Sequence, residues 1–208
     1  MSAGEISRPL LVVISAPSGA GKTTLCDNVR SALPSVRRAV TCTTRDPREG
    51  EEDGADYYFL GEEEFLARVD GGEFLENAVV HGNHYGVLKS ELRAKLAEGA
   101  DVLLNIDVQG AATIRDRAAS DDVLKEALIT VFLRPPSLKE LEQRLRGRST
   151  DADDVIAGRL EIAKDEIAQS GLFDYTLTSG TREADLEEML SIIEAARNKR
   201  PQNKTSDE

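Results

Sequence analysis

The residues best suited to chemistry include a glycine-rich segment near the amino terminus. APSGAGKTT, at 16–24, has the GxxxxGK(S/T) spacing of a phosphate-binding loop, except that Ala16 takes the place of the first glycine. Such a loop binds phosphate oxygens through inward-pointing backbone N–H groups above the N-terminus of a helix. The segment therefore predicts a nucleoside-triphosphate site. A plain glycine-rich turn between a strand and a helix is the structural alternative.

Each position of this loop has an expected task. Gly19 and Gly21 supply permissive backbone dihedral angles. Lys22 supplies positive charge for the transferred phosphate, and Thr23 supplies a hydroxyl for Mg²⁺. An alanine at position 16 is tolerable if its φ is negative, because a methyl group adds little bulk. The expected ATP-binding residues of the loop are Ala16, Pro17, Ser18, Gly19, Ala20, Gly21, Lys22, Thr23 and Thr24.

A second segment, TCTTRDPREGE at 41–51, concentrates positive charge. Arg45 and Arg48 are three residues apart, and Glu51 follows three residues later. The 208-residue chain has a formal net charge of −12, so neighbouring arginines are more informative here than in a basic protein. Two guanidinium groups can bind a phosphate dianion and fix its direction. A solvated turn of mixed charge is the alternative interpretation.

A third candidate is Asp107, which ends the apolar run DVLLNID at 101–107. A carboxylate delivered to the edge of a sheet can help to place Mg²⁺ or bind a substrate. An aspartate that merely caps the following helix is the structural alternative. No NKxD-like guanine motif follows, which weakens the interpretation of the chain as a switch GTPase.

These residues need an α/β framework to bring them together. Apolar runs at 10–16, 101–107 and 127–133 are typical of strands buried on both faces of a parallel sheet. Further strands are expected at 38–44, 73–80 and 175–178, and helices at 22–33, 62–70, 88–99, 137–145, 154–168 and 183–197. Strands that alternate with helices predict an α/β fold with a mainly parallel sheet.

Composition excludes several classes of protein. The acidic balance argues against a nucleic-acid partner, and the run at 10–14 is too short to span a bilayer. Cys26 and Cys42 form no CxxC pair, as expected for a reduced cytoplasmic protein. His81 and His84 lack a nearby third ligand, so we expect loop residues and no metal site. Nothing in the sequence assigns an oligomeric state.

In order and spacing, the motifs resemble those of the guanylate kinase family over about residues 8–200. They are SAPSGAGKTTL, TTRDPREGE followed by DYYF, GEFLENA, GNHYG, IDVQG and RPPSLKELEQRLRGRST. The resemblance implies a P-loop NTPase core, an inserted GMP-binding lobe and a helical lid. In this chain the core would be about 8–40, 98–133 and 165–200, the lobe about 41–97, the lid about 134–164, and a disordered tail about 198–208.

The resemblance also implies the residues that bind GMP. Arg45 and Arg48 match the arginines that hold its phosphate, and the hydroxyls of Tyr57 and Tyr85 would add to that grip. Glu76 matches the carboxylate that accepts from guanine N1–H and the exocyclic amine, a donor pair that adenine lacks. Thr41 and Asp107 match further contacts around the guanine, while Glu51 matches a motif glutamate that buttresses the arginines. The expected GMP-binding set is Thr41, Arg45, Arg48, Glu51, Tyr57, Glu76, Tyr85 and Asp107.

On the ATP side, the resemblance implies lid arginines that reach the ATP phosphates on closure. Arg144 and Arg148 lie four apart on one expected helix, and Arg159 lies on the next. For Arg144, simple i,i+4 pairing with Glu140 is the alternative. The expected catalytic residues are Lys22, Arg45, Arg148 and Arg159, with Arg144 as an ATP-binding residue and Mg²⁺ held with ATP at Thr23.

Three positions depart from the family pattern. Val87 stands where a hydroxyl residue usually contacts guanine, Asn105 replaces a frequent acidic residue, and Ser179 replaces an asparagine near the adenine. The loss of the hydroxyl at position 87 should weaken one contact to the base. None of them removes a charge close to the transferred phosphoryl group.

The implied activity is transfer of the ATP γ-phosphoryl group to GMP, which gives ADP and GDP. The resemblance also suggests dGMP as an acceptor and a role in purine nucleotide metabolism and GMP recycling. Two alternatives stay open. One is an interaction module that keeps the fold without phosphotransfer, against which the intact loop and the lid arginines argue. The other is a kinase for a different monophosphate, against which Glu76 argues.

Overall fold

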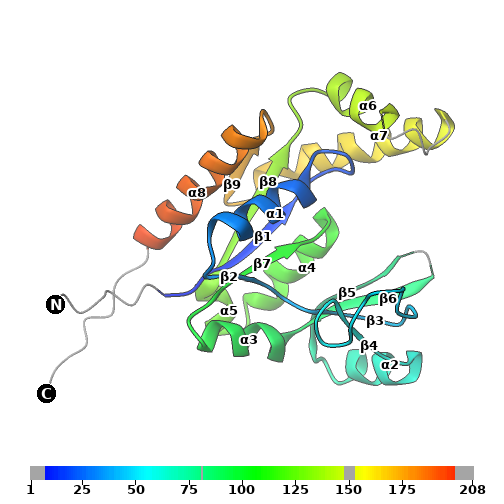
Figure 1. The fold of residues 1–208 in the computed structure, drawn as a ribbon, viewed down its shortest axis with the longest axis vertical. Coiled ribbons are helices and arrows are strands. Elements are labelled where there is room, and N and C mark those ends of the chain that lie inside the picture. Colours follow the sequence, from blue (N-terminus) through cyan, green and yellow to red (C-terminus); the bar gives the residue numbers. More distant parts are fainter. Residues whose placement is uncertain (1–7, 81, 148–152, 200–208) are drawn as a thin grey trace, which may run out of the picture.

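The computed structural model describes residues 8–80, 82–147 and 153–199, and within them the strands form two sheets (Figure 1). The larger sheet has five strands in the order β2-β7-β1-β8-β9, and every pair in it is parallel. Its strands are β1 (Leu11–Ser15), β2 (Val36–Arg38), β7 (Asp101–Asn105), β8 (Leu128–Arg134) and β9 (Tyr175–Thr178). The predicted α/β class with a mainly parallel sheet is confirmed.

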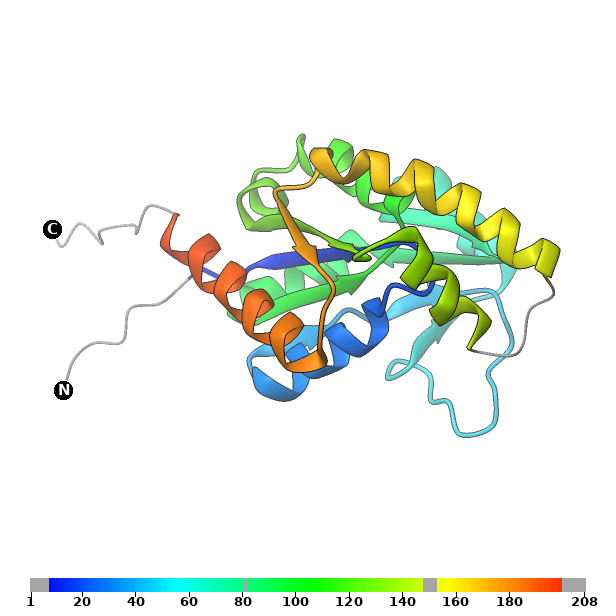
Figure 2. The same cartoon turned by 90° about the horizontal axis from the view of Figure 1, so that it is seen from above.

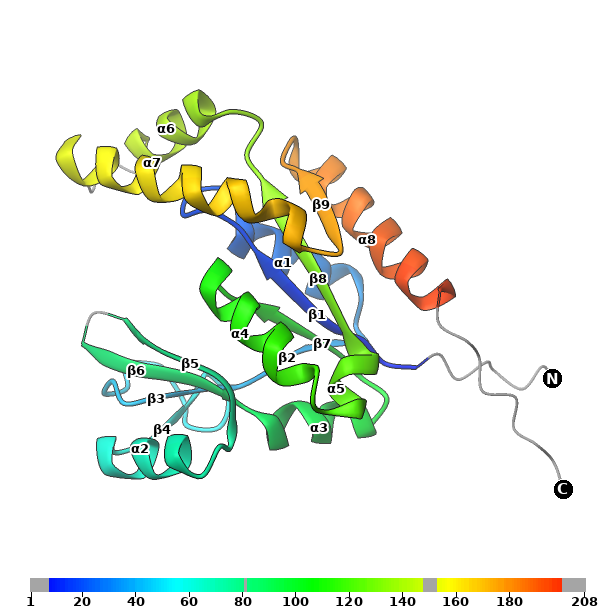
Figure 3. The same cartoon turned by 180° about the vertical axis from the view of Figure 1, so that it is seen from behind.

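Helices cover both faces of this sheet, as Figures 2 and 3 show. One face carries α1 (Lys22–Ala32) and α8 (Arg182–Asn198), whose apolar residues, among them Val29 and Met189, pack in one buried cluster. The opposite face carries α3 (Lys89–Ala97), α4 (Val108–Ala118) and α5 (Asp122–Ala127). The three central strands β1, β7 and β8 are therefore buried on both sides, which explains their continuous apolar runs, whereas the edge strands β2 and β9 keep exposed residues.

The smaller sheet has the order β4-β3-β6-β5 and a hydrophobic cluster of its own. Its strands are β3 (Thr41–Thr43), β4 (Tyr57–Phe59), β5 (Phe74–Val80) and β6 (Asn83–Leu88), and α2 (Glu62–Asp70) packs on it. Phe65 of α2 stacks on Phe74, with ring centroids 4.5 Å apart. This cluster gives the smaller sheet a core separate from that of the larger sheet.

Two helices follow β8 and lie close to the phosphate-binding loop. They are α6 (Leu138–Arg146) and α7 (Asp153–Ala168), and a 3₁₀ helix (Gln169–Leu172) leads from them to β9. Ser137 caps α6 by accepting from the backbone N–H of Glu140 at 3.1 Å. Figures 1 and 3 show that α6 and α7 and the smaller sheet extend from the same side of the larger sheet.

One expected strand is divided between the two sheets. The prediction of a single strand at 38–44 is wrong, because 36–38 pairs with β7 in the larger sheet and 41–43 pairs with β4 and β6 in the smaller one. Val36 is buried in the core of the larger sheet, called the main core below, whereas Cys42 is buried in the core of the smaller sheet. The pattern of residues 38–44 indicates that side chains are buried, but it does not indicate in which core. It therefore could not reveal that the chain passes from one sheet to the other within this segment.

Several elements were not expected from local patterns. These are β4, β6, α4 and α5. Helix α3 falls within the segment 41–97 but packs Leu92 and Leu96 into the main core. Helix α8 extends to Asn198, and residues 200–208 of the expected tail lie outside the described residues. No helix in the described ranges is both long and apolar enough to cross a membrane.

A buried ion pair fastens the last helix to the central sheet. Asp101, 3% exposed, accepts from the backbone N–H of Leu10 at 2.8 Å and pairs with Arg197 of α8. Removing one partner of such a pair leaves an uncompensated charge. We expect Arg197→Ala to lower the free energy of unfolding by about 2–3 kcal/mol in urea titrations, less than for a fully buried pair because Arg197 is partly exposed.

The matched control for this prediction is Arg37→Ala. Arg37 pairs with Glu98 at 2.8 Å, but both side chains are more than half exposed. Exposed pairs contribute about 0–1 kcal/mol. Equal losses in the two variants would contradict the assignment of Asp101 and Arg197 as a stabilising buried pair.

Candidate active site

The glycine-rich loop joins β1 to α1 and has the backbone geometry that its sequence predicts. Gly19 and Gly21 have φ values of 90° and 98°, and Gly21 is the N-cap of α1. At Gly19 an added Cβ would also come within 2.9 Å of the Leu145 side chain of α6. Glycine is therefore required at position 19 both for its left-handed backbone and for the close approach of α6.

Lys22 points from the start of α1 toward the end of β7. Its Nζ donates to the backbone carbonyl of Ile106 at 2.8 Å. Burial lowers the pKa of the Lys22 ammonium, and the Asp107 carboxylate acts in the opposite direction. A cavity of about 320 Å³ lies above the loop, and its lining is Ala16, Pro17, Ser18, Gly19, Gly21, Lys22, Thr23, Thr24, Asp107 and Glu166. Of the nine expected loop residues, Ala20 alone is absent from this lining.

A second cavity, of about 440 Å³, lies between the larger and the smaller sheet. It is lined by five of the residues expected to bind GMP, namely Thr41, Tyr57, Glu76, Tyr85 and Asp107. Thr23 and Asp107 line both this cavity and the one above the loop. The two cavities therefore lie next to each other and share part of their walls.

Glu76 is a buried carboxylate in the wall of the larger cavity. Its side chain is near the first turn of α4, since a Cβ added at Gly110 would lie 3.3 Å from Glu76 Oε1 and 3.3 Å from Asp107 Oδ1. Burial, with the Asp107 carboxylate second, raises the pKa of Glu76 to about 7, while Arg117 acts in the opposite direction. Glu76 can therefore change its ionisation state near neutral pH.

Asp107 caps a helix, which is the structural alternative for its motif, and it also lines both cavities. Its Oδ1 accepts from the backbone N–H of Gly110 at 2.7 Å, which caps α4.

Val87 pairs with Glu76 across β5 and β6 and is buried in the same cavity wall. The departure at position 87 thus places an apolar side chain beside Glu76. Asn105 donates to Thr23 Oγ1 at 3.4 Å.

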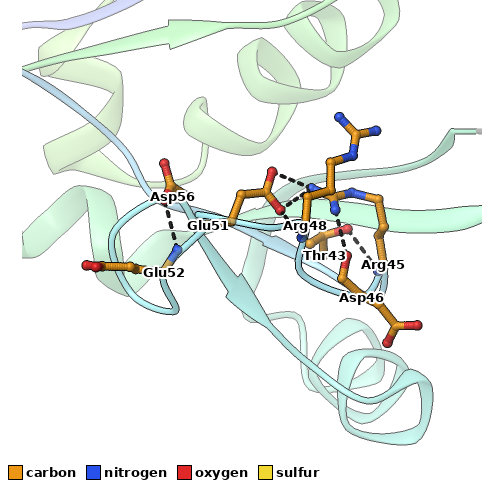
Figure 4. A network of polar contacts seen from close by, with 7 residues as sticks. All are labelled: Thr43, Arg45, Asp46, Arg48, Glu51, Glu52 and Asp56. Carbon is orange, nitrogen blue, oxygen red and sulfur yellow. Dashed lines mark hydrogen bonds and ion pairs between the residues drawn. The ribbon is translucent and has the colours of Figure 1, made fainter.

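Arg45, Arg48 and Glu51 form a network within the loop before β4 (Figure 4). The Glu51 carboxylate accepts from Arg45 at 2.8 and 2.9 Å and from the backbone N–H of Arg48 at 2.7 Å. The hydrogen bond to Glu51 raises the pKa of the Arg45 guanidinium, which thus stays charged. Glu51 therefore contacts both arginines, as a buttressing residue should.

The two tyrosines lie beside this network. The rings of Tyr57 and Tyr85 meet edge to face with centroids 6.2 Å apart, and the Arg45 guanidinium lies 5.5 Å from the Tyr57 ring centroid. Neither Arg45 nor Arg48 lines the 440 Å³ cavity, although both tyrosines do. The structure therefore brings the tyrosines to the cavity and holds Arg45 next to Tyr57.

The Arg144 side chain extends from α6 to the phosphate-binding loop. It donates to the Ala20 carbonyl at 3.3 Å and to Ser179 Oγ at 3.1 Å, and the expected contact with Glu140 is present at 3.9 Å. Arg144, Ala20 and Ser179 border a third cavity, of about 250 Å³, whose wall also includes Thr24. Arg159 lies partly buried on α7 and lines none of the three cavities, and Arg148 lies outside the described residues.

Sequence reasoning missed several charged residues near the site, among them Arg38, Arg117 and Glu166. The Arg38 guanidinium lies 5.5 Å from the Tyr57 ring centroid and lines the 440 Å³ cavity. Glu166 of α7 lines the loop cavity, and Arg117 of α4 binds the backbone next to Glu76. None of them belongs to a recognisable motif, so only their spatial neighbours reveal them. His84 packs its ring on Phe65, and His81 lies outside the described residues.

Comparison with known proteins agrees with this geometry. The family model described as guanylate kinase matches residues 8–196. Guanylate kinases of Geobacter metallireducens and Aromatoleum aromaticum are 44% and 46% identical, each over 90% of this chain and over 89% and 88% of their own lengths. The crystal structure of guanylate kinase from Anaplasma phagocytophilum has a TM-score of 0.64 and 32% identity, with 96% of this chain and 89% of that chain covered. The chain belongs to the guanylate kinase family.

Proposed function

We propose that this protein transfers the γ-phosphoryl group of ATP to GMP, producing ADP and GDP in the cytoplasm. The adjoining cavities, which share Thr23 and Asp107 as walls, carry the proposal because a phosphoryl group passes directly between two bound nucleotides. We further propose that dGMP is an acceptor and that the reaction serves purine nucleotide metabolism and GMP recycling. The family membership supports the proposal.

The larger cavity is assigned to GMP. Glu76 would accept hydrogen bonds from guanine N1–H and the exocyclic amine, with Thr41 and Asp107 beside the base. Tyr57 and Tyr85 would bind the phosphate together with Arg45 and Arg48, which a closing movement of the smaller sheet would bring to it. Glu51 holds both arginines in place. Residues 41–97 would thus form the GMP-binding lobe on a core of about 8–40, 98–133 and 165–200.

The loop cavity is assigned to the ATP phosphates. Lys22 and the backbone of residues 16–24 would bind phosphate oxygens, and Arg144 lies near enough to the loop to contact ATP. Residues 134–164 would form a lid that brings Arg148 and Arg159 to the phosphates. The Thr23 hydroxyl fits Mg²⁺, because this ion prefers oxygen ligands. When bound with ATP, Mg²⁺ neutralises phosphate charge.

Transfer then requires positioning and charge neutralisation more than covalent work by the protein. A GMP phosphate oxygen forms a bond to the γ-phosphorus while the bond between that phosphorus and the β–γ bridging oxygen breaks, and ADP leaves with the electron pair. Lys22 and the arginines neutralise charge spread over the transferred group. No side-chain general base is needed, since an ionised phosphate is already nucleophilic. Closure of the lid excludes water, which prevents hydrolysis of ATP.

A coupled assay for ADP tests the function directly. With ATP and Mg²⁺ present, we expect rapid turnover with GMP, slower or comparable turnover with dGMP, and little with AMP or UMP. A protein that produced no ADP with any monophosphate would be an interaction module. One that preferred AMP or UMP would be a kinase for another acceptor.

Arg48 offers a test of the GMP phosphate site. Among the described contacts its backbone N–H binds Glu51, and its guanidinium points away from that carboxylate (Figure 4). Arg48→Lys keeps the charge but loses the two-pronged donor geometry. We expect the KM for GMP to rise about tenfold, which corresponds to the loss of roughly one charge-assisted hydrogen bond, and the KM for ATP to stay unchanged. Arg68→Lys, on α2 of the same lobe, is the control, and equal changes in both variants would contradict the assignment.

A further inference from the structure

Strand β5 crosses between two hydrophobic cores immediately before Glu76. Phe74 packs in the cluster of the smaller sheet, whereas Leu75 is buried in the main core. The pairing of β5 with β6 shifts register between Phe74 and Glu76, so the strand carries a bulge there. A bulge interrupts the ladder and redirects the side chains that follow it. The direction of Glu76 therefore depends on how this bulge is held.

Arg117, in the last turn of α4, holds the bulge. One guanidinium nitrogen donates to the carbonyls of Phe74 at 3.0 Å and Leu75 at 3.1 Å, and lies 3.4 Å from Asn77 Oδ1. These three residues flank Glu76 on both sides in the chain. A partly buried cation thus binds the backbone that carries the Glu76 side chain.

Helix α4 contacts the Glu76 segment at both of its ends. Its first turn approaches the Glu76 carboxylate, where a Cβ at Gly110 would lie 3.3 Å from Oε1. Its last turn carries Arg117, whose positive charge favours the ionised form of Glu76 and opposes the effect of Asp107. The helix therefore contacts the Glu76 segment at two points, and Arg117 opposes the larger effect that burial has on the pKa of the carboxylate.

We propose that Arg117 is a positioning residue for guanine recognition, which fixes the β5 bulge so that Glu76 presents an ionised carboxylate to the base. The inference rests on the proposed function, because it assigns Glu76 to guanine. Arg117 does not itself line the cavity, so its effect passes through Glu76. The loss of Arg117 should therefore weaken acceptor binding and leave the ATP site intact.

Other charged and titratable groups face the same cavity and have to be separated from this effect. Besides Asp107 they are Cys26, Asp27 and Arg30 of α1, Arg38 of β2, Tyr57 of β4 and Tyr85 of β6. The phosphate of GMP itself titrates at about pH 6. Glu76→Gln supplies the baseline, since its pH profile keeps all of these groups and lacks only the titration of Glu76.

The experiment compares Arg117→Met, Arg117→Lys and the control Arg115→Met. Arg115 lies on the same helix, but its guanidinium packs over the Phe173 ring at 5.0 Å, away from β5. For Arg117→Met we expect a KM for GMP about tenfold higher, kcat within about twofold, an unchanged KM for ATP and an equally weakened GMP affinity by calorimetry without ATP. The acid limb of kcat/KM for GMP should move to higher pH.

The lysine variant separates charge from geometry. Arg117→Lys should keep the acid limb near its wild-type position while the KM for GMP rises part of the way, because one ammonium cannot replace the fork of donors. Unchanged GMP affinity and pH profile in Arg117→Met would overturn the proposal, as would parallel changes in Arg115→Met. If wild type showed no GMP preference, or Glu76→Gln kept it, the assignment of Glu76 in the proposed function would fail instead.

Discussion

Replacing Lys22 by alanine should reduce phosphoryl transfer by about 10²- to 10³-fold while the protein stays folded. The ammonium group of Lys22 lies near the N-terminus of α1, where it donates to the Ile106 carbonyl and lines the cavity above the loop. Removing one fixed donor from a group that carries transition-state charge typically costs a factor of this size. The kcat for GMP with saturating ATP measures the effect.

The control for this variant is Lys125→Ala. Lys125 is an exposed lysine on α5 that lines none of the three cavities of the candidate site. Its loss removes the same charge and a similar side chain without touching the loop, so activity should remain at the wild-type level. Thermal unfolding should give nearly the same midpoint for both variants. Full turnover in Lys22→Ala would remove the assignment of the loop to ATP.

The parts of the fold that the sequence predicts best depend on local patterns. The phosphate-binding loop was placed correctly between a buried strand and a helix, because β1 is apolar throughout and Gly19 and Gly21 require left-handed backbone. The strands at the centre of the larger sheet were found for the same reason.

The remaining features depend on contacts between distant segments. The strand predicted at 38–44 divides because Val36 and Cys42 find different cores. Arg117 reaches Phe74 across 43 positions of the chain, so no local spacing could indicate this contact. The directions of Arg144 and Glu166 depend on how α6 and α7 pack on the loop. Residue type and spacing therefore indicate which side chains could serve the reaction, but they do not indicate which neighbours hold those side chains.

Replacing Glu76 by glutamine should lower kcat/KM for GMP by about ten- to several-hundredfold and partly relax the preference over AMP. The amide keeps the size of the side chain but places a donor opposite guanine N1–H or the exocyclic amine. A buried donor left unsatisfied costs roughly 1–3 kcal/mol, and more where a charge-assisted bond is lost. Values of kcat/KM for GMP and AMP measure the effect. An unchanged GMP:AMP ratio would mean that guanine is recognised elsewhere.

Glu76→Gln should also make the nucleotide-free protein more stable at alkaline pH, which separates lost recognition from lost folding. Because burial and Asp107 raise the pKa of Glu76 to about 7, the folded protein binds a proton more tightly than the unfolded chain does. The stability that this proton contributes is fully present below about pH 4.5, the usual range of a glutamate, and is lost as the pH rises through about 7.

A glutamine carries no such dependence. At pH 8 we expect Glu76→Gln to exceed wild type by on the order of 1–3 kcal/mol in urea unfolding, and at pH 4.5 we expect the two proteins to be nearly equal. A variant that were less stable than wild type at pH 8 would contradict the raised pKa, and its loss of GMP activity would then follow from unfolding. A buried carboxylate that serves recognition lowers the stability of the fold when it is ionised. Its replacement by glutamine should therefore raise the stability and lower the GMP selectivity together.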